Sequence, residues 1–172
     1  MNIDRKGCSR RRFGAALAGL PLLAAVPALQ AAPAAIGEKV RWPGITLLDG
    51  QSVSADALRD AATVVVFFST TCPYCERHNQ HIDKLARATR DQPLWVIGAA
   101  RDHSVAPVRD YLTRHDYRFP VTLDHQPLHE ALSPRKVIPL TCVIDRSGIL
   151  RTVIPGEMSE DDVLELARWA KV

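Results

Sequence analysis

The feature that most constrains the fold is a continuous apolar stretch that runs almost directly into a pair of cysteines. Residues 63–68 read Thr-Val-Val-Val-Phe-Phe, a β-branched and aromatic run typical of a strand covered on both faces. After a short polar loop, apolar residues such as Ile82 and Leu85 recur at helical spacing with charges between them. The pattern predicts a central strand, a loop and a helix that begins near Cys72 or Pro73, where proline is tolerated.

The rest of the chain alternates between strand and helix patterns, which favours an α/β fold. Residues 141–145 and 150–154 are joined through a turn that contains Gly148, and this spacing indicates a β-hairpin. Ser159 precedes a run of acidic residues and is expected to cap the last helix. We therefore expect one domain with a mixed sheet and helices on both faces. Other strands are expected at residues 45–48, 94–100 and 119–123, and other helices at residues 55–60, 105–115 and 127–132.

The start of the chain has the three parts of an export signal. A basic stretch ends at Arg12, an apolar run covers residues 13–26, and small residues follow, with Ala32-Pro33-Ala34 as one candidate cleavage site. We predict that residues 1–34 are the signal and that residues 35–172 form the mature domain. The expected location is the periplasm.

Two questions about this leader stay open. Ser9-Arg10-Arg11-Arg12-Phe13 resembles the twin-arginine export motif, and a general secretory signal rich in arginine is the alternative. Pro21, Pro27 and the short apolar run argue against a transmembrane helix of roughly 20 apolar residues, so an uncleaved anchor is the less favoured reading. Cys8 lies before the apolar run and is expected to leave with the signal.

The net charge of +3 comes from the leader. Residues 1–34 hold five of the 22 Lys and Arg residues and one of the 19 acidic residues, which leaves 17 basic against 18 acidic residues in the mature domain. A domain so close to neutral offers no electrostatic case for binding nucleic acid.

Three cysteines remain after the leader, Cys72, Cys75 and Cys142, and an odd number cannot all pair within one chain. A C-x-x-C motif can attach haem, bind zinc or carry redox chemistry. Glu76 stands where haem attachment needs histidine, and a second C-x-x-C for a zinc ribbon is missing. A buried strand before the motif and a helix after it favour redox chemistry. We expect Cys142, in a strand three positions after Pro139, to be a buried and unreactive thiol that lies near the active site. A regulatory or mispairing thiol is the alternative.

The position of each cysteine assigns it a role. Cys72 falls at the helix N-terminus, where free backbone N–H groups and the positive end of the helix dipole stabilise a thiolate, so Cys72 is predicted to be the nucleophile. Cys75 lies one turn further, where it can resolve the mixed disulfide. The working group is then a Cys72–Cys75 disulfide, without a bound cofactor or metal. A purely structural disulfide between the same residues is the alternative.

Pro139 is the second signal. In Lys136-Val137-Ile138-Pro139-Leu140-Thr141 it directly precedes a predicted strand. With the C-x-x-C motif, this arrangement resembles the thioredoxin superfamily, in which a cis proline before the third core strand faces the cysteines. The resemblance implies that Pro139 forms part of the active site and that the backbone of Ile138 pairs with an extended substrate segment. An ordinary trans proline in a loop is the alternative.

The sequence is more closely similar to periplasmic thioredoxin-like proteins of the TlpA and ResA kind, over roughly residues 36–171. This resemblance implies a thioredoxin fold with an N-terminal strand extension and a central insertion. It also implies that Pro73 and Tyr74 border the substrate groove. The motifs that carry it are Asp49-Gly50, Val64-Val65-Val66-Phe67-Phe68, Phe119-Pro120-Val121-Thr122-Leu123-Asp124 and the run from Ile138 to Gly148.

Two departures from the family leave the direction of electron flow open. Thr71 stands where family members commonly have tryptophan, and the run up to Cys75 also resembles disulfide-forming and isomerising relatives. Val66 replaces the buried aspartate that cytosolic thioredoxins place six residues before the first cysteine. Proton transfer to Cys75 must then use water or another group, and Glu76 is a candidate.

The resemblance implies an exported, monomeric reductase of protein disulfides. Its electrons would come from a membrane donor of the DsbD or CcdA kind, and its clients would be proteins of cytochrome c maturation or other envelope proteins. A disulfide oxidase or isomerase is the alternative within the class. A metallochaperone that holds copper or zinc through Cys72, Cys75 and a histidine is the alternative outside it. We expect the histidines to be solvent-exposed, with His78 able to influence the thiolate as a cation.

Overall fold

The computed structural model describes residues 32–171, so nearly all of the predicted export signal lies outside the described residues. The core is a five-stranded sheet in the order β5-β4-β3-β6-β7. As predicted, the apolar run forms the central strand, and all seven residues of β3 are buried. β3 pairs in parallel with β4 and antiparallel with β6, which makes the sheet mixed. The strands are β3 Ala62–Phe68, β4 Leu94–Ala100, β5 Val121–Thr122, β6 Leu140–Ile144 and β7 Leu150–Pro155.

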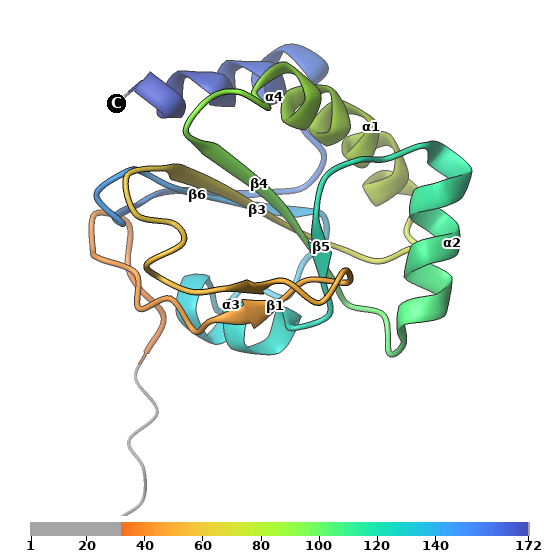
Figure 1. Ribbon diagram of the computed structural model, residues 1–172, viewed down its shortest axis with the longest axis horizontal. Coiled ribbons are helices and arrows are strands. Elements are labelled where there is room, and N and C mark those ends of the chain that lie inside the picture. The colour runs from red at the N-terminus through yellow and green to blue at the C-terminus, as the bar shows by residue number, and fades with distance from the viewer. Residues whose placement is uncertain (1–31, 172) are drawn as a thin grey trace, which may run out of the picture. The chain divides into compact units, whose positions relative to one another are not determined.

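Helices cover both faces of this sheet (Figure 1). One face packs against α1, α2 and the C-terminal helix α4, which continues as the 3-10 helix η1. The other face packs against α3 and a small two-stranded hairpin, β1 and β2. This is the expected α/β arrangement of a thioredoxin fold. The elements are β1 Ile45–Thr46, β2 Ser52–Val53, α1 Pro73–Ala88, α2 Val105–His115, α3 His125–Leu132, α4 Glu160–Glu165 and η1 Leu166–Lys171.

Residues of β3 alternate between the two cores because neighbouring side chains of a strand point to opposite faces. Val64, Val66 and Phe68 belong to the core beneath α1, whereas Val65 and Phe67 belong to the core above α3. A strand buried on both sides explains why the run lacks polar positions. The same alternation decides which residues of β6 can lie near the cysteines.

Local differences from the sequence-based expectation are small. Residues 55–60 form successive turns instead of a helix, although the Ala57 N–H bonds to Ser54 Oγ at 3.4 Å as a cap would. β2 was not predicted, and α3 begins at His125, two residues earlier than expected. Ser159 caps α4, with its hydroxyl accepting a hydrogen bond from the Asp162 N–H. The three tryptophans are partly buried and pack against the two cores.

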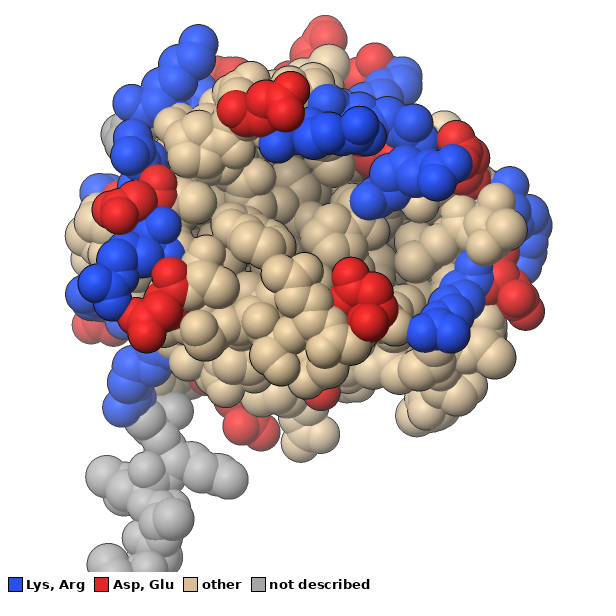
Figure 2. All heavy atoms as spheres, in the orientation of Figure 1, with Lys and Arg blue, Asp and Glu red and all other residues tan. Residues whose placement is uncertain are grey.

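Charged side chains of both signs lie mainly around the edge of the face shown in Figure 2, and other residues occupy its centre. Within residues 32–171, no helix has the length and apolar character needed to cross a membrane.

Candidate active site

The helix α1 begins at the first cysteine. Cys72 is the N-cap residue with an extended backbone, and Pro73 occupies the first turn, where its missing N–H costs nothing. The N–H of Cys75 donates to Cys72 Sγ over 3.3 Å. Thr70 anchors the preceding loop, because its backbone N–H and its hydroxyl both donate to the Asp102 carboxylate. The sulfur of Cys72 is therefore held where the N–H groups of the first helical turn are free.

The two thiols of the motif lie in different environments. Cys72 is partly exposed, whereas Cys75 is fully buried in the core beneath α1. Burial, with the hydrogen bond to Cys72 as the next cause, raises the pKa of Cys75 to about 12. A reagent from solution therefore reaches Cys72 first.

The Ile138–Pro139 peptide bond is cis, as the resemblance predicted. Leu140 pairs with Phe67 across the sheet, so the proline lies beside the end of β3 from which the cysteine loop departs. The Pro139 carbonyl accepts a hydrogen bond from the Gly156 N–H at 2.8 Å. Ile138 is partly buried and contacts both cores. The fold thus brings Cys72 and Pro139 to one edge of the sheet.

Exposed apolar side chains surround this edge. Pro73 is exposed, and Tyr74 is 60% exposed on the first turn of α1. The Arg77 guanidinium lies over the Tyr74 ring, 5.0 Å from its centroid. Val137, next to Ile138, is 46% exposed. These residues form a surface on which a protein segment could lie.

Val66 occupies the position at which cytosolic thioredoxins have a buried aspartate. Val66 is fully buried in the core that also contains Cys75, and the Glu76 side chain is exposed. Two tyrosines and the charge of Arg101 act in the region of the dithiol. The Tyr117 hydroxyl donates to the backbone carbonyl of Glu76, and burial raises the pKa of Tyr111 and of Tyr117. Glu76 stays a candidate for proton transfer only if its side chain turns inward.

Cys142 is buried, as expected, but it does not lie near the dithiol. Its neighbour Thr141 faces α1, so Cys142 points to the opposite face of the sheet, where it joins the core above α3. Burial raises the pKa of the Cys142 thiol to about 12. The expected proximity to the active site was wrong because Cys142, although three positions after Pro139, lies on the opposite face of the sheet from Cys75.

The expectation of exposed histidines holds only for His103. The other histidines are half-buried or, in the case of His78, 0% exposed; the half-buried ones are His81, His115, His125 and His129. Nδ1 of His78 accepts the Met158 N–H at 3.2 Å, and its Nε2 lies 3.1 Å from Thr141 Oγ1. Burial lowers the pKa of His78 to about 4, so it is neutral and not a cation that could influence the thiolate. The sequence did hold a signal: Cys75, His78 and Ile82 share one face of α1 at spacings of three and four.

The metal-binding alternative requires a histidine beside the cysteines. Both ring nitrogens of His78, the nearest histidine in sequence, already have hydrogen-bond partners. Among residues 32–171, no three His, Cys, Asp or Glu side chains are arranged to hold a metal ion.

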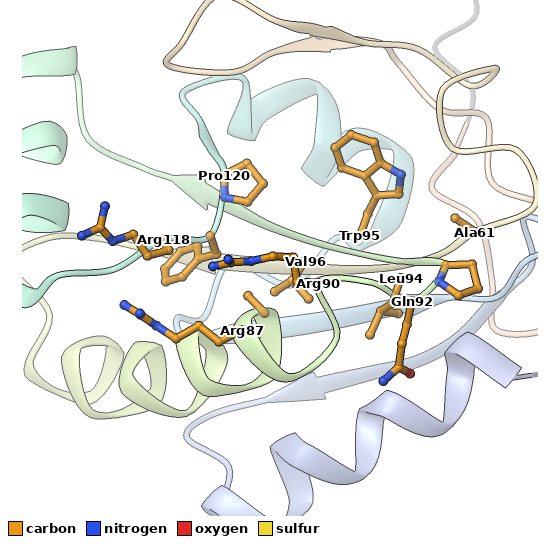
Figure 3. A pocket seen from close by; sticks show the side chains of 12 residues that line it. Ala61, Arg87, Arg90, Gln92, Leu94, Trp95, Val96, Arg118 and Pro120 are labelled. Carbon is orange, nitrogen blue, oxygen red and sulfur yellow. The ribbon is translucent and has the colours of Figure 1, made fainter.

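The pocket in Figure 3, with a volume of about 340 Å³, lies elsewhere. Leu94 and Pro120, which line it, mark the amino ends of β4 and β5, whereas Cys72 follows the carboxyl end of the parallel strand β3. Arg87 and Arg118 also line it, and Asp116 binds both. This pocket contains no thiol and is not part of the candidate active site.

Comparison with known proteins gives one consistent result. Residues 27–168 match the Redoxin family. The thiol-disulfide oxidoreductase ResA of Halalkalibacterium halodurans is 27% identical over 125 residues, which cover 72% of this chain and 70% of that protein. ResA of Bacillus thuringiensis subsp. konkukian is 24% identical over 123 residues, or 70% of each.

Solved structures show the same fold. A thiol:disulfide interchange protein of the thioredoxin family from Chlorobium tepidum superposes with a TM-score of 0.71 at 24% identity, covering 79% of this chain and 97% of that one. A secreted thiol-disulfide isomerase from Corynebacterium glutamicum gives a TM-score of 0.70 at 18% identity, covering 77% and 86%.

Proposed function

Because this chain belongs to the Redoxin family and is a ResA-like thiol-disulfide oxidoreductase of the thioredoxin superfamily, we propose that it reduces protein disulfides in the cell envelope. The observation that carries the proposal is the unequal pair of thiols: Cys72 is reachable at a helix N-terminus, and Cys75 is buried behind it.

The proposed reaction proceeds in two exchanges. The Cys72 thiolate attacks one sulfur of a substrate disulfide, which forms a mixed disulfide and releases the other substrate sulfur as a thiolate that takes up a proton. Cys75 then loses its proton and attacks Cys72 Sγ, so the substrate leaves as a dithiol. The protein ends with a Cys72–Cys75 disulfide, having given two electrons to the substrate.

The environment of Cys75 supports its role as the resolving thiol. Burial raises the pKa of Cys75 to about 12, so this thiol is protonated at neutral pH and does not compete with Cys72 as the attacking group. In the proposal, the reductive direction comes from the resemblance to proteins of the TlpA and ResA kind.

The surface at the sheet edge supports a protein substrate. Tyr74, on the first turn of α1, and Val137, next to Ile138, expose apolar area. Ile138 offers backbone groups next to the cis proline. In the proposal, Pro73, Tyr74 and Ile138 contact an extended client segment while Pro139 forms the platform.

The proposed location is the periplasm, supported by the leader pattern of residues 1–34 and by the secreted relative from Corynebacterium glutamicum. A membrane dithiol donor of the DsbD or CcdA kind would return two electrons to the Cys72–Cys75 disulfide. Clients would include proteins of cytochrome c maturation. The protein would act as a monomer and would not bind nucleic acid.

The reduction potential tests the direction of electron flow. The mature protein is equilibrated with glutathione buffers, and the fraction of oxidised Cys72–Cys75 is measured by alkylation and mass spectrometry. A value near about −270 mV is expected of a reductase. A value near about −120 mV would identify an oxidant and overturn the proposed direction.

A further inference from the structure

His78 has two hydrogen bonds that assign its tautomer. The Met158 backbone N–H can only donate, so Nδ1 of His78 accepts and carries no proton. The neutral ring then has its proton on Nε2, which donates to Thr141 Oγ1 at 3.1 Å. One fully buried side chain of α1 therefore binds β6 on one side and the loop before α4 on the other.

That loop binds three parts of the site at once. Gly156, Glu157 and Met158, here called the 156–158 segment, each make one connection. The Gly156 N–H donates to the Pro139 carbonyl at 2.8 Å, and the Met158 N–H donates to His78. The Glu157 carboxylate accepts two hydrogen bonds from Arg77, at 2.8 and 2.7 Å.

The Arg77 contact continues to the surface. The guanidinium that binds Glu157 in a bidentate pair also lies 5.0 Å from the centre of the Tyr74 ring. A planar, bidentate pair fixes the orientation of the guanidinium. The 156–158 segment thus connects to Tyr74, one of the two residues between the cysteines, as well as to the cis proline.

A buried polar side chain needs hydrogen-bond partners, whereas an apolar side chain of similar size could fill the same space without them. Here the hydrogen bonds of His78 join the helix that carries the dithiol to the strand that follows Pro139. A protein substrate must meet the Cys72 sulfur and the Ile138 backbone together, whereas a small disulfide needs the sulfur alone.

We propose that the 156–158 segment, through His78, Arg77 and Pro139, is a positioning element that fixes the helix bearing Cys72 relative to the cis-proline backbone for reaction with protein substrates. This inference rests on the proposed function, because it assigns the segment to the recognition of protein disulfides. Thiolate chemistry at Cys72 itself does not depend on it.

The test compares two rates in each variant: kcat/KM for reduction of insulin, and the rate of reaction of Cys72 with oxidised glutathione. His78→Leu removes both hydrogen bonds and keeps an apolar side chain of moderate size. We expect it to lower kcat/KM for insulin about tenfold, because small displacements of reacting groups are costly. The rate with oxidised glutathione should stay within about twofold.

Further variants separate positioning from folding. His78→Gln can still donate to Thr141 and accept from Met158, and it should recover most of the insulin activity. Glu157→Gln weakens a partly exposed pair with little risk to folding, and about a threefold loss with insulin alone is expected. Lys84→Gln is the matched control, because Lys84 joins α1 to Glu160 of α4 without contacting the 156–158 segment.

Two outcomes would overturn the inference. The first is a proportional fall of both rates in His78→Leu and Glu157→Gln, which would mean a general effect on the fold or the thiolate. The second is two unchanged rates in Glu157→Gln and in folded His78→Leu. If the unsubstituted protein oxidises reduced proteins and does not reduce insulin, the proposed function fails, and the same ratio of rates measured for oxidation still tests the positioning role.

Discussion

Nε2 of His78 lies 3.1 Å from the hydroxyl oxygen of Thr141. This hydrogen bond joins the helix that follows Cys72 to the strand that follows Pro139. His78 and Thr141 are both fully buried. The two chain segments that build the candidate active site are therefore joined beneath the surface, and the consequences for stability can be measured.

The stability of the protein should fall in mild acid because of His78. Burial lowers its pKa to about 4 from an ordinary value of 6.5, so between these pH values the unfolded chain binds more protons than the folded protein. The free energy of unfolding therefore rises with pH in this window, and about 3 kcal/mol is lost as the pH falls from 6.5 through 4. His81 and Glu157 are the titratable groups that face the ring and act on it.

Urea unfolding of the unsubstituted protein and of His78→Gln isolates this effect, because carboxylates titrate in both. As the pH falls from 6.5 through 4, the unfolding free energy of the unsubstituted protein should fall by about 3 kcal/mol relative to that of His78→Gln. A difference that does not change with pH would show that His78 keeps an ordinary pKa.

Thr141→Val should destabilise the protein although valine has nearly the same shape. The change leaves the Nε2–H of His78 buried without an acceptor, at a cost of about 1–3 kcal/mol. Thr141→Ser keeps the hydroxyl and should cost less. Denaturant titration of both variants measures the order, and a Val variant more stable than the Ser variant would contradict the hydrogen bond.

Cys142 should take no part in catalysis. It lies on the opposite face of the sheet from Cys75, and its thiol has a pKa of about 12 because of burial. Cys142→Ala is expected to cost about 1 kcal/mol of stability and to leave the rate of insulin reduction within about twofold. Peptide mapping that finds Cys142 paired with Cys72 or Cys75 in the folded, oxidised protein would contradict this assignment.

Gly98, in the middle of β4, has no room for a side chain. A Cβ there would lie 2.8 Å from Cε2 of Phe119 and 3.0 Å from both Phe68 and Val121. Gly98→Ala should therefore cost about 1–3 kcal/mol through overpacking. Phe119→Leu should relieve part of this cost, so the two changes together should destabilise less than their sum. Strict additivity in denaturant unfolding would show that Phe119 is not the obstacle.

The sequence predicted the parts of the fold that depend on local patterns. The β-branched run became β3, and the helix begins at Pro73 with Cys72 as its N-cap, within the predicted start near Cys72 or Pro73. The cis bond at Pro139 was expected from resemblance and is present. The two-residue strand β2 was missed because Ser52–Val53 is too short to show alternation.

Contacts between distant segments could not be predicted in the same way. All five residues of β6 are buried, so the pattern does not tell which face Thr141 and Cys142 take. The bond between His78 and Met158 joins residues 80 positions apart, and only the assembled fold brings them together. His78 was expected at the surface because histidine is polar, although it shares a helix face with Cys75 and Ile82.

The most direct test of the central claim is trapping of a mixed disulfide. Cys75→Ser removes the thiol that resolves the complex, so this variant should accumulate a disulfide between Cys72 and a cysteine of insulin. Peptide mapping locates that disulfide. Cys72→Ser, with Cys75 buried, should trap nothing and reduce no insulin. If Cys72→Ser keeps the activity or forms the covalent complex through Cys75, Cys72 is not the nucleophile and the account fails.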